Sequence, residues 1–387
     1  MADIRPFRGV RYSSFRLDSA LCPPYDVIGP ELADALRRRR SNAVFLELPQ
    51  GTPPAKYARA AALWRRWTVD GTLARDPKPA FYAIEERYRL SGETRVRRGI
   101  LSALGATPKA AVAIIPHERT LAKPKVDRLK MLDAVGVNSS PIFGVFADPS
   151  GAARRAIAAG MKGRPDAAGQ SHAKVDYRLW VVDEPKLIAA IRAALSPCSI
   201  LIADGHHRYC VSRDHHARTK GPGTDAVLAY LVADEDPGLV VLPTHRIAGR
   251  SLLRRASAFT PLKKARNLGE LEKLIARSEN PYAFGLIEKG FYFGAPKPNG
   301  CKSGLAVEWL GSNLLSQIPP EEMSYTPDAA LALKKAKAAG GAAVLVKPFS
   351  VAQVRRAARA VGLLPQKSTF FYPKISTGLV FRPLDAE

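Results

Sequence analysis

The sequence has few acidic side chains for its length. Its 387 residues include 35 Asp and Glu against 59 Lys and Arg, which gives a formal net charge of +24. A positive net charge of this size permits binding to nucleic acid or to anionic substrates. The basic residues are spread along the chain, however, so a solvated basic surface explains the charge as well. Nucleic acid therefore stays an open but less favoured partner.

Cysteine is also scarce, and its spacing argues against a common class of metal site. The four cysteines are Cys22, Cys198, Cys210 and Cys301, and no two of them form a CxxC pair. Structural zinc and thioredoxin-like redox sites therefore have no support. The sequence opens without an apolar leader, and no apolar run reaches the roughly 18 residues of a membrane span. We expect a cytoplasmic chain without membrane contact, of an oligomeric state that the sequence leaves open.

Three motifs of well-known enzyme classes are missing as well. The sequence contains no GxxxxGK[ST] loop, no GxGxxG between a strand and a helix, and no GxSxG elbow. P-loop NTPases, dinucleotide-binding Rossmann enzymes and Ser-His-Asp hydrolases are therefore disfavoured. At roughly 150 residues per domain, the length predicts two to three domains.

What the sequence does contain is a succession of apolar strands and amphipathic helices. The patterning predicts strands at 80–90, 95–104, 141–146, 177–182, 199–203 and 226–232, and helices at 54–69, 185–195, 206–219, 268–277, 327–339 and 351–361. We predict an α+β fold with a mixed-sheet core at 105–250, an N-terminal α/β segment at 1–104 and a C-terminal α+β segment at 251–387 that closes on the core. The Ala-, Gly- and charge-rich stretch 148–172 is expected to be a surface insertion.

The strongest candidate site is the segment that joins the apolar strand 199–203 to the next predicted helix. A glycine there permits a backbone conformation that a side chain would oppose. The helix start presents unpaired N–H groups and partial positive charge, and an arginine with two imidazoles would complete a site suited to phosphate. The aspartate could hold Mg²⁺ or could simply cap the helix. The residues are Asp204, Gly205, His206, His207 and Arg208.

Four other segments combine prolines with polar side chains. In Pro116-His117-Glu118, a carboxylate after an apolar stretch is suited to general-base catalysis, although a surface glutamate at a helix start is the alternative. The remaining three have the composition of binding loops or of well-packed turns. They contribute Tyr25, Asp26, Thr244, His245, Arg246, Lys367, Ser368 and Thr369.

As a set, the motifs of this sequence resemble the family catalogued as domain of unknown function 1015. The segments that carry the resemblance are IRPFRG, PPYDVI, IIPHERT, KVDRL, SPIF, LIADGHHRY, LPTHR and LLPQKSTFFYPKISTGLVF. Within them, PHE and DGHHR are similar to ParB/sulfiredoxin-like proteins, and most of all to the free L-serine kinases of that superfamily. The resemblance implies a ParB/sulfiredoxin-like core with N- and C-terminal α/β extensions.

The same resemblance implies roles for individual residues. Glu118 matches the catalytic base, and Asp204, His206, His207 and Arg208 match the segment that holds phosphates and metal. Of this segment we assign Asp204 and His206 to catalysis, with Asp204 also as the metal ligand. The remaining loops have no counterpart in the small kinases. From their composition we assign His117, Lys367, Ser368 and Thr369 with Gly205 to the nucleotide, and Tyr25, Asp26, Thr244, His245 and Arg246 to the acceptor.

The predicted function is phosphotransfer from ATP or ADP, with Mg²⁺, to a small hydroxyl substrate, with free L-serine as the best guess. One alternative is a ParB-like nucleotide-binding switch or DNA-associated protein without kinase activity, although no helix-turn-helix is evident after the DGHHR segment. A second alternative is a structural or interaction protein in which these loops only pack.

Overall fold

The computed structural model describes residues 1–118 and 122–385. They divide into two compact units. Unit 1 comprises residues 1–115, 120–240 and 373–387, and unit 2 comprises 116–119 and 241–372. Unit 1 is therefore assembled from three separate stretches of sequence.

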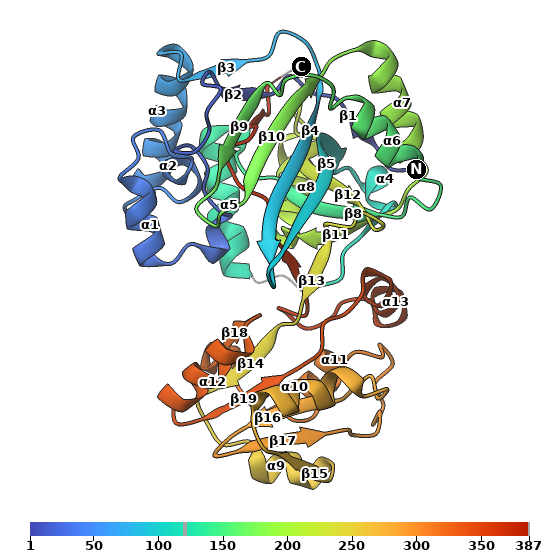
Figure 1. Ribbon diagram of the computed structural model, residues 1–387. Helices are drawn as coiled ribbons and strands as arrows, with labels where there is room; N and C mark the ends of the chain where they lie inside the picture. The colour runs from blue at the N-terminus through green and yellow to red at the C-terminus, as the bar shows by residue number, and fades with distance from the viewer. Residues whose placement is uncertain (119–121, 386–387) are drawn as a thin grey trace. The chain divides into compact units, whose positions relative to one another are not determined.

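Unit 1 is built on a mixed sheet (Figure 1). Within the described residues the sheet has nine strands, with β1 (Ile4–Arg5) paired to β5 and the others in the order β6 (Ile114–Ile115), β11 (Ile200–Asp204), β8 (Ile142–Phe146), β12 (Ala226–Ala233), β5 (Glu93–Gly105), β4 (Phe81–Leu90), β10 (Asp176–Val182), β9 (Ala167–Gln170). The pairs β6/β11 and β8/β12 are parallel, and the other neighbours are antiparallel. The predicted turn between β4 and β5 is confirmed: Ser91 and Gly92 both have positive φ, as a two-residue type I′ turn requires.

Helices and short ladders complete unit 1. The helices are η1 (Tyr25–Val27), α1 (Pro30–Arg37), α2 (Val44–Glu47), α3 (Ala55–Val69), α4 (Pro108–Ala111), α5 (Ala122–Val135), α6 (Ala152–Ala159), α7 (Pro185–Leu195) and α8 (His206–Thr219). The ladders pair β2 (Val10–Tyr12) with β3 (Leu73–Arg75) and β7 (Val137–Asn138) with β21 (Arg382–Pro383). Figure 1 shows α6 and α7 together, and their Ile157 and Ile191 join the buried apolar side chains of one sheet face.

The opposite face of this sheet carries a row of buried polar side chains. Glu86 of β4 lies directly opposite Arg97 of β5 and Tyr177 of β10. Arg97 and Glu86 form an ion pair with both side chains fully buried, and the Tyr230 hydroxyl donates to the same carboxylate at 2.7 Å. The segment 373–381 packs within unit 1, where Phe381 is completely buried.

Unit 2 has an antiparallel sheet of its own. Within the described residues its order is β15 (Leu262–Ala265), β17 (Phe291–Gly294), β16 (Phe284–Ile287), β19 (Ala342–Leu345), β14 (His245–Ala248), β18 (Met323–Thr326). One face packs on α9 (Leu253–Phe259) and α11 (Ala306–Ser312), and the other on α10 (Leu268–Arg277) and α12 (Ala329–Ala338). The remaining elements are β13 (Val240–Leu242), β20 (Phe370–Tyr372), η2 (Pro320–Glu322) and α13 (Val351–Val361).

The predicted α+β class with a mixed sheet is confirmed, and four helices have the predicted bounds: α7, α8, α10 and α13. The ParB/sulfiredoxin-like character of the core stays a prediction. The contacts group the chain differently from the predicted segments 1–104, 105–250 and 251–387, because β4 and β5 share the large sheet with β8, β11 and β12.

The stretch 148–172 is part of the fold and not a surface insertion. It forms α6 and β9, and β9 pairs with β10 over four residues. Ala153 and Ile157 are buried in the apolar cluster of the sheet. Among the described residues, no helix combines the length and apolar content needed to cross a bilayer.

Candidate functional site

The predicted phosphate segment begins where strand β11 ends. Asp204 is the last residue of the strand and His206 the first residue of α8, so Gly205 alone makes the turn between them. Gly205 has φ +86°, and a Cβ there would lie 3.1 Å from the Arg208 guanidinium carbon and 3.0 Å from an Ile142 methyl group. The positive φ favours glycine at this position, and a side chain there would also crowd Arg208 and Ile142. As the residue before the helix, it leaves the N-terminus of α8 without a capping side chain of its own.

Two cations share the Asp204 carboxylate at this turn. Arg208 Nη2 donates to Asp204 Oδ2 at 2.7 Å, and Lys374 Nζ donates to Asp204 Oδ1. The three side chains, called here the Asp204 cluster, are 11–14% exposed. With two positive charges and one negative, the cluster has a net positive charge at the entrance of α8.

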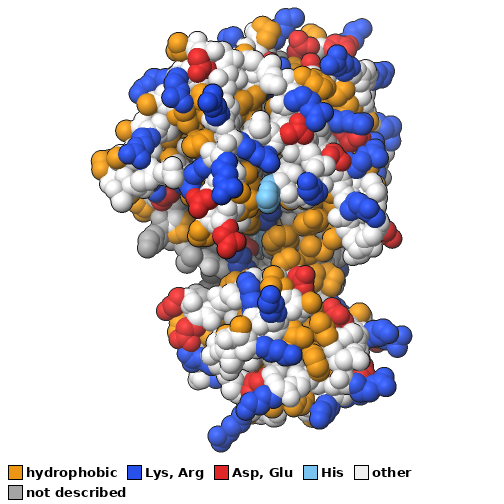
Figure 2. Space-filling model, turned by 60° about the vertical axis from the view of Figure 1, so that its left-hand side comes forward, with side chains coloured by type: hydrophobic (Ala, Val, Ile, Leu, Met, Phe, Trp, Pro, Cys, Tyr) orange, Lys and Arg blue, Asp and Glu red, His pale blue; other side chains and the backbone are white. Residues whose placement is uncertain are grey.

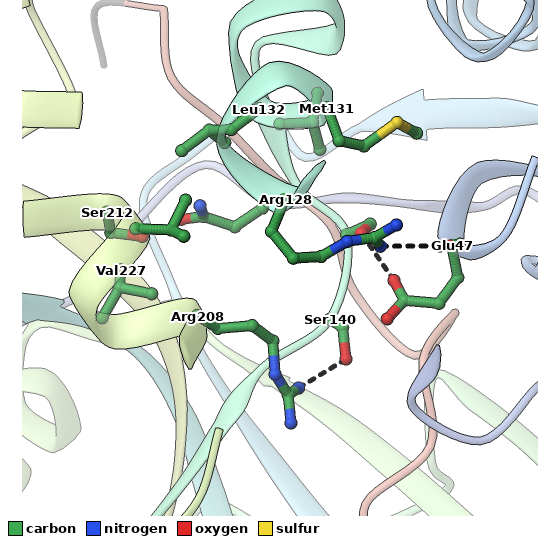
Figure 3. Close-up of a pocket in the computed structure, with 12 residues that line it drawn as sticks. Glu47, Arg128, Met131, Leu132, Ser140, Arg208, Ser212 and Val227 are labelled. Atoms are coloured by element: carbon green, nitrogen blue, oxygen red, sulfur yellow. Dashed lines mark hydrogen bonds between the residues drawn. The ribbon is translucent and has the colours of Figure 1, made fainter. Parts of the chain in front are cut away.

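Arg208 is also bonded on its other side. Its Nη1 donates to Ser140 Oγ at 2.6 Å (Figure 3). The same nitrogen donates to the Pro141 carbonyl. The guanidinium therefore joins the start of α8 to the loop before β8. An arginine held by three groups in this way keeps a fixed position, and it also contributes to the stability of unit 1.

Arg208 lines a cavity of about 50 Å³ beside this cluster (Figure 3). Across the cavity, Glu47 is 1% exposed and its carboxylate accepts the Tyr25 backbone N–H at 3.2 Å and the Ser139 hydroxyl at 2.8 Å. Arg128 Nη1 donates to the Glu47 carbonyl at 2.8 Å, and its guanidinium lies 4.4 Å from the centre of the Tyr25 ring. Glu47 and Arg128 thus hold the Tyr25 loop against α5.

Three of the four other predicted segments meet in unit 2. His117 Nε2 and Thr369 Oγ1 are hydrogen-bonded at 3.0 Å, and the His117 carbonyl accepts the Leu364 N–H at 2.8 Å. Glu118 is half-buried and forms a bridge with Leu364. Arg246 Nη2 donates to the Lys367 carbonyl at 3.3 Å. The three segments 116–118, 244–246 and 367–369, called here the Glu118 cluster, therefore form one group of neighbours.

Arg246 is the buried cation of the Glu118 cluster. It is 4% exposed, and its guanidinium donates to the carbonyls of Thr244 and Lys367. Burial lowers its pKa to about 10, while Tyr325 and Glu118 act in the opposite direction. The side chain is therefore charged at neutral pH, and the two carbonyl groups to which it donates are neutral. Such a cation suits an anionic group of a ligand.

These motifs also identify the family. A family model described as "Protein of unknown function (DUF1015)" matches residues 4–314. The chain belongs to the DUF1015 family. The match includes the DGHHR segment and ends within unit 2, before the C-terminal motif at 363–381, and it confirms the resemblance at the level of this family.

Solved structures resemble the DUF1015 chain only distantly. A mutant free serine kinase in complex with AMP is 12% identical, with 73% of this chain and 90% of that chain covered and a TM-score of 0.41. A conserved hypothetical protein from Pyrococcus furiosus is 13% identical, with 75% and 93% covered and a TM-score of 0.38. C-terminally truncated SbnI from Staphylococcus aureus is 10% identical, with 73% and 87% covered and a TM-score of 0.41. At these scores the likeness carries no inference about function, and no curated protein matches the DUF1015 chain significantly.

The predicted site residues of this DUF1015 protein are divided between the two units. Asp204, Gly205 and Arg208 lie in unit 1, as do Tyr25 and the exposed Asp26, while Glu118 and the loop Lys367, Ser368 and Thr369 lie in unit 2. Of this loop, Ser368 and Thr369 are buried. The predicted cleft shared by Glu118, Asp204 and His206 stays a prediction, and so does the contribution of the 367–369 loop to it.

Three members of the site in this DUF1015 chain were given no role from the sequence. Lys374 belongs to the same candidate binding loop as Lys367–Thr369, five residues further along, and Glu47 and Arg128 lie in helical segments. The only signal for Lys374 was a lysine directly after a proline in an aromatic loop. Glu47 carried no signal, because a single glutamate among apolar residues of a short helix has the pattern of an ordinary surface position. Among the described residues, no group of three or more His, Cys, Asp or Glu side chains could hold a metal ion.

His245 forms a buried hydrogen bond within the sheet of unit 2. Its Nδ1 accepts the Val346 N–H at 3.3 Å, and burial, with help from Arg246, lowers its pKa to about 4. The unfolded chain then binds a proton that the folded chain does not bind, so stability is complete above pH 6.5 and is lost as the pH falls toward 4. We expect unit 2 to lose about 3 kcal/mol over this window.

Denaturant unfolding between pH 7.5 and 4 measures this loss. His245→Asn removes the titration and should flatten the pH dependence over this window, whereas His172→Asn, at an exposed position of unit 1, should leave it unchanged. Equal pH dependence in wild type and His245→Asn would contradict a neutral, buried His245.

Proposed function

We propose that this DUF1015 protein transfers the terminal phosphoryl group of ATP or ADP to the hydroxyl group of a small acceptor, with free L-serine as the best guess. The observation that carries the proposal is the Asp204 cluster, which brings two cations to the uncapped N-terminus of α8. Phosphoryl transfer demands positioning and charge neutralisation more than covalent chemistry from the protein. A cationic helix entrance supplies both.

The nucleotide phosphates are assigned to the entrance of α8. The backbone N–H groups that follow Gly205 and the imidazoles of His206 and His207 would bond phosphate oxygens, while Arg208 supplies fixed positive charge. The assignment of His117 and of Lys367, Ser368 and Thr369 to the nucleotide belongs to the same proposal.

In this proposal Mg²⁺ would be held by Asp204 alone among the protein side chains. In phosphotransfer sites Mg²⁺ is commonly held by one or two carboxylates together with substrate phosphates and water. Both Asp204 oxygens are bonded to cations, so an ion at Asp204 requires Arg208 or Lys374 to give up one bond. When bound, Mg²⁺ would neutralise charge on the phosphates.

Glu118 is the proposed general base. The acceptor oxygen forms a bond to the terminal phosphorus, the bond from that phosphorus to the bridging oxygen breaks, and its electron pair leaves with AMP or ADP. The acceptor proton passes to the Glu118 carboxylate. Arg246, buried in the same cluster, would hold an anionic group of the acceptor such as the carboxylate of serine, and Tyr25, Asp26, Thr244 and His245 are the further acceptor residues proposed.

A product assay tests this function. Purified protein is incubated with ATP or ADP, Mg²⁺ and L-serine or a panel of other small alcohols, and phosphorylated product is detected by ³¹P NMR. Formation of a phosphomonoester from one acceptor is the expected result. Nucleotide that raises the melting temperature without any product would favour the nucleotide-binding switch, and no thermal shift with ATP or ADP would favour a structural role.

The DNA-associated alternative rests on the net charge. Figure 2 shows Lys and Arg side chains scattered among acidic and apolar side chains on the visible face, without a continuous basic stripe. Retention on heparin at low salt, with steep salt dependence, would favour that alternative over the kinase.

Arg208→Lys is expected to weaken nucleotide binding by about 10-fold or more and to lower the melting temperature. Lysine keeps the charge, but its single ammonium cannot bond Ser140, the Pro141 carbonyl and Asp204 together as the guanidinium does. Titration calorimetry with ADP measures the affinity. Arg213→Lys, at an exposed position of the same helix, is the matched control and should behave as wild type. Unchanged ADP affinity in Arg208→Lys would remove Arg208 from the phosphate site.

A further inference from the structure

The sheet face of unit 2 that packs on α9 and α11 continues into a polar pair. Arg246 of β14 lies directly opposite Tyr325 of β18, and two residues along the same ladder Ala248 lies opposite Met323. Residues directly opposite each other on antiparallel strands point to the same face. Ala248 belongs to the apolar cluster formed with α9 and α11, and Met323 packs against it. Arg246 and Tyr325 therefore extend this face beyond its apolar part, and both lie within unit 2.

The two side chains of this pair are close to each other and to the rest of the Glu118 cluster. The Arg246 guanidinium carbon lies 6.0 Å from the centre of the half-buried Tyr325 ring, a cation–π distance. Burial raises the pKa of the Tyr325 hydroxyl, Glu118 acts in the same direction, and Arg246 and Lys367 act against it. The hydroxyl is therefore protonated at neutral pH and can donate a hydrogen bond.

The polar groups around this pair have bonding capacity that the protein does not use. The Tyr325 hydroxyl forms no hydrogen bond within the part of the chain that the structure describes. Thr244 is 3% exposed, and its Oγ1 is buried without a hydrogen-bond partner among the described residues. Arg246 is a buried cation whose hydrogen bonds go to two neutral carbonyls. Buried polar groups and charges left in this way cost free energy, and an anionic ligand would satisfy them.

The loop that contacts Arg246 has an unusual backbone at the point of contact. Lys367, whose carbonyl accepts Arg246 Nη2, has φ +55°. Left-handed backbone is uncommon for a residue other than glycine, and strained positions of this kind cluster at ligand-binding sites. The conformation presents a carbonyl to the guanidinium and so fixes the direction of the buried cation.

We propose that Tyr325 is a specificity-determining residue, whose hydroxyl donates to a carboxylate oxygen of the acceptor while Arg246 balances the carboxylate charge. The proposal rests on the proposed function and narrows its acceptor to hydroxy acids, including hydroxy amino acids. One guanidinium and one hydroxyl match the single charge and the two oxygens of a carboxylate. A neutral alcohol would leave Arg246 without a countercharge, and sites built to bind a polar group discriminate strongly against analogues that lack it.

The test compares two hydroxy acids with their amides, which keep the hydroxyl group but lack the negative charge. Titration calorimetry is run with L-serine and D-glycerate and with both amides, in the presence and absence of ADP. Wild type should bind at least one acid and bind its amide more weakly. Tyr325→Phe keeps the ring beside Arg246 and removes the hydroxyl. We expect its affinity for that acid to fall about 10- to 100-fold, as for a lost hydrogen bond to a charged group, with unchanged ADP affinity and melting temperature.

Tyr292→Phe is the matched control for this variant. Tyr292 is half-buried on β17 of the same sheet, and it packs against the same apolar cluster. Its replacement also removes one tyrosine hydroxyl from unit 2, so it should bind the acid as wild type does.

The outcomes separate this proposal from the proposed function. Equal affinity of wild type and Tyr325→Phe for the acid overturns the role of Tyr325. Wild type that binds neither acid, or that binds the amides as tightly, overturns the carboxylate subsite, and a phosphomonoester formed from a neutral alcohol would then leave phosphotransfer standing. Equal losses of acid and ADP affinity with a lower melting temperature show a structural role and overturn the proposal. Acid binding that depends on Tyr325, without any product from ATP or ADP, supports the carboxylate subsite and overturns phosphotransfer.

Discussion

Replacing Arg97 by methionine is expected to lower the free energy of unfolding of unit 1 by about 3–5 kcal/mol. The free energy falls because Glu86, the ion-pair partner of Arg97, stays buried in the variant. Glu86 is fully buried, and without Arg97 its carboxylate keeps the Tyr230 hydroxyl but loses its countercharge. Substitutions that leave a buried charge without its countercharge are among those that lower the free energy of unfolding most. Urea unfolding followed by circular dichroism measures the loss.

The same strand offers a matched control for this variant. Arg95 is two residues away on β5 and pairs with Glu93 at 2.8 Å, but the two side chains are 34% and 70% exposed. Arg95→Met should cost no more than about 1 kcal/mol, as surface pairs do. If Arg97→Met lowers the free energy of unfolding no more than Arg95→Met does, the buried ion pair is not important for the stability of unit 1. Replacing Arg97 and Glu86 together by apolar residues should recover part of the loss.

Glu118→Gln is expected to reduce turnover by roughly 10²- to 10⁴-fold, the usual contribution of a positioned general base. Glutamine keeps the size and the hydrogen-bonding capacity of the side chain but accepts no proton. Nucleotide affinity should hold, because the phosphates are assigned to the entrance of α8. Initial rates with the acceptor identified by the product assay, together with ADP titration, separate the two effects.

Glu272→Gln is the matched control for the base. It lies at an exposed position of α10 in the same unit, so it changes the charge of unit 2 by the same amount. We expect it to keep wild-type turnover. Full activity in Glu118→Gln would exclude Glu118 as the base, while nucleotide binding would still identify a nucleotide-dependent protein.

The local parts of the fold could be predicted from the sequence. Pro185 begins α7, a glycine precedes α8, and Ser91-Gly92 makes the turn of the β4–β5 hairpin, because each depends on residues next to one another in the chain. The prediction for the stretch 148–172 was wrong because it, too, used only neighbouring residues. Its alanines and glycines resemble a loop by composition, and only pairing with β10 makes β9 a strand.

The candidate site was predictable to the extent that it lies within single motifs. Asp204, Gly205 and Arg208 are adjacent in sequence, and their grouping follows from one strand, one turn and one helix. Lys374 contacts Asp204 although the two lie 170 positions apart in the sequence, and Glu47 contacts Ser139 at a separation of 92 positions. Such contacts depend on the whole topology of unit 1, which no local pattern encodes.

The three-part composition of unit 1 also bears on the order in which the chain can fold as it is synthesised. The stretch 373–385 supplies β21, the buried Phe381 and Lys374, and it follows every residue of unit 2 along the chain. Domains generally fold as units, the earlier ones first, as the chain leaves the ribosome. Here the unit that begins first is completed last, because unit 2 is available along the chain while unit 1 still lacks its C-terminal segment. A ribosome-bound chain halted before residue 373 should therefore hold a protease-resistant unit 2 beside an incomplete and protease-sensitive unit 1.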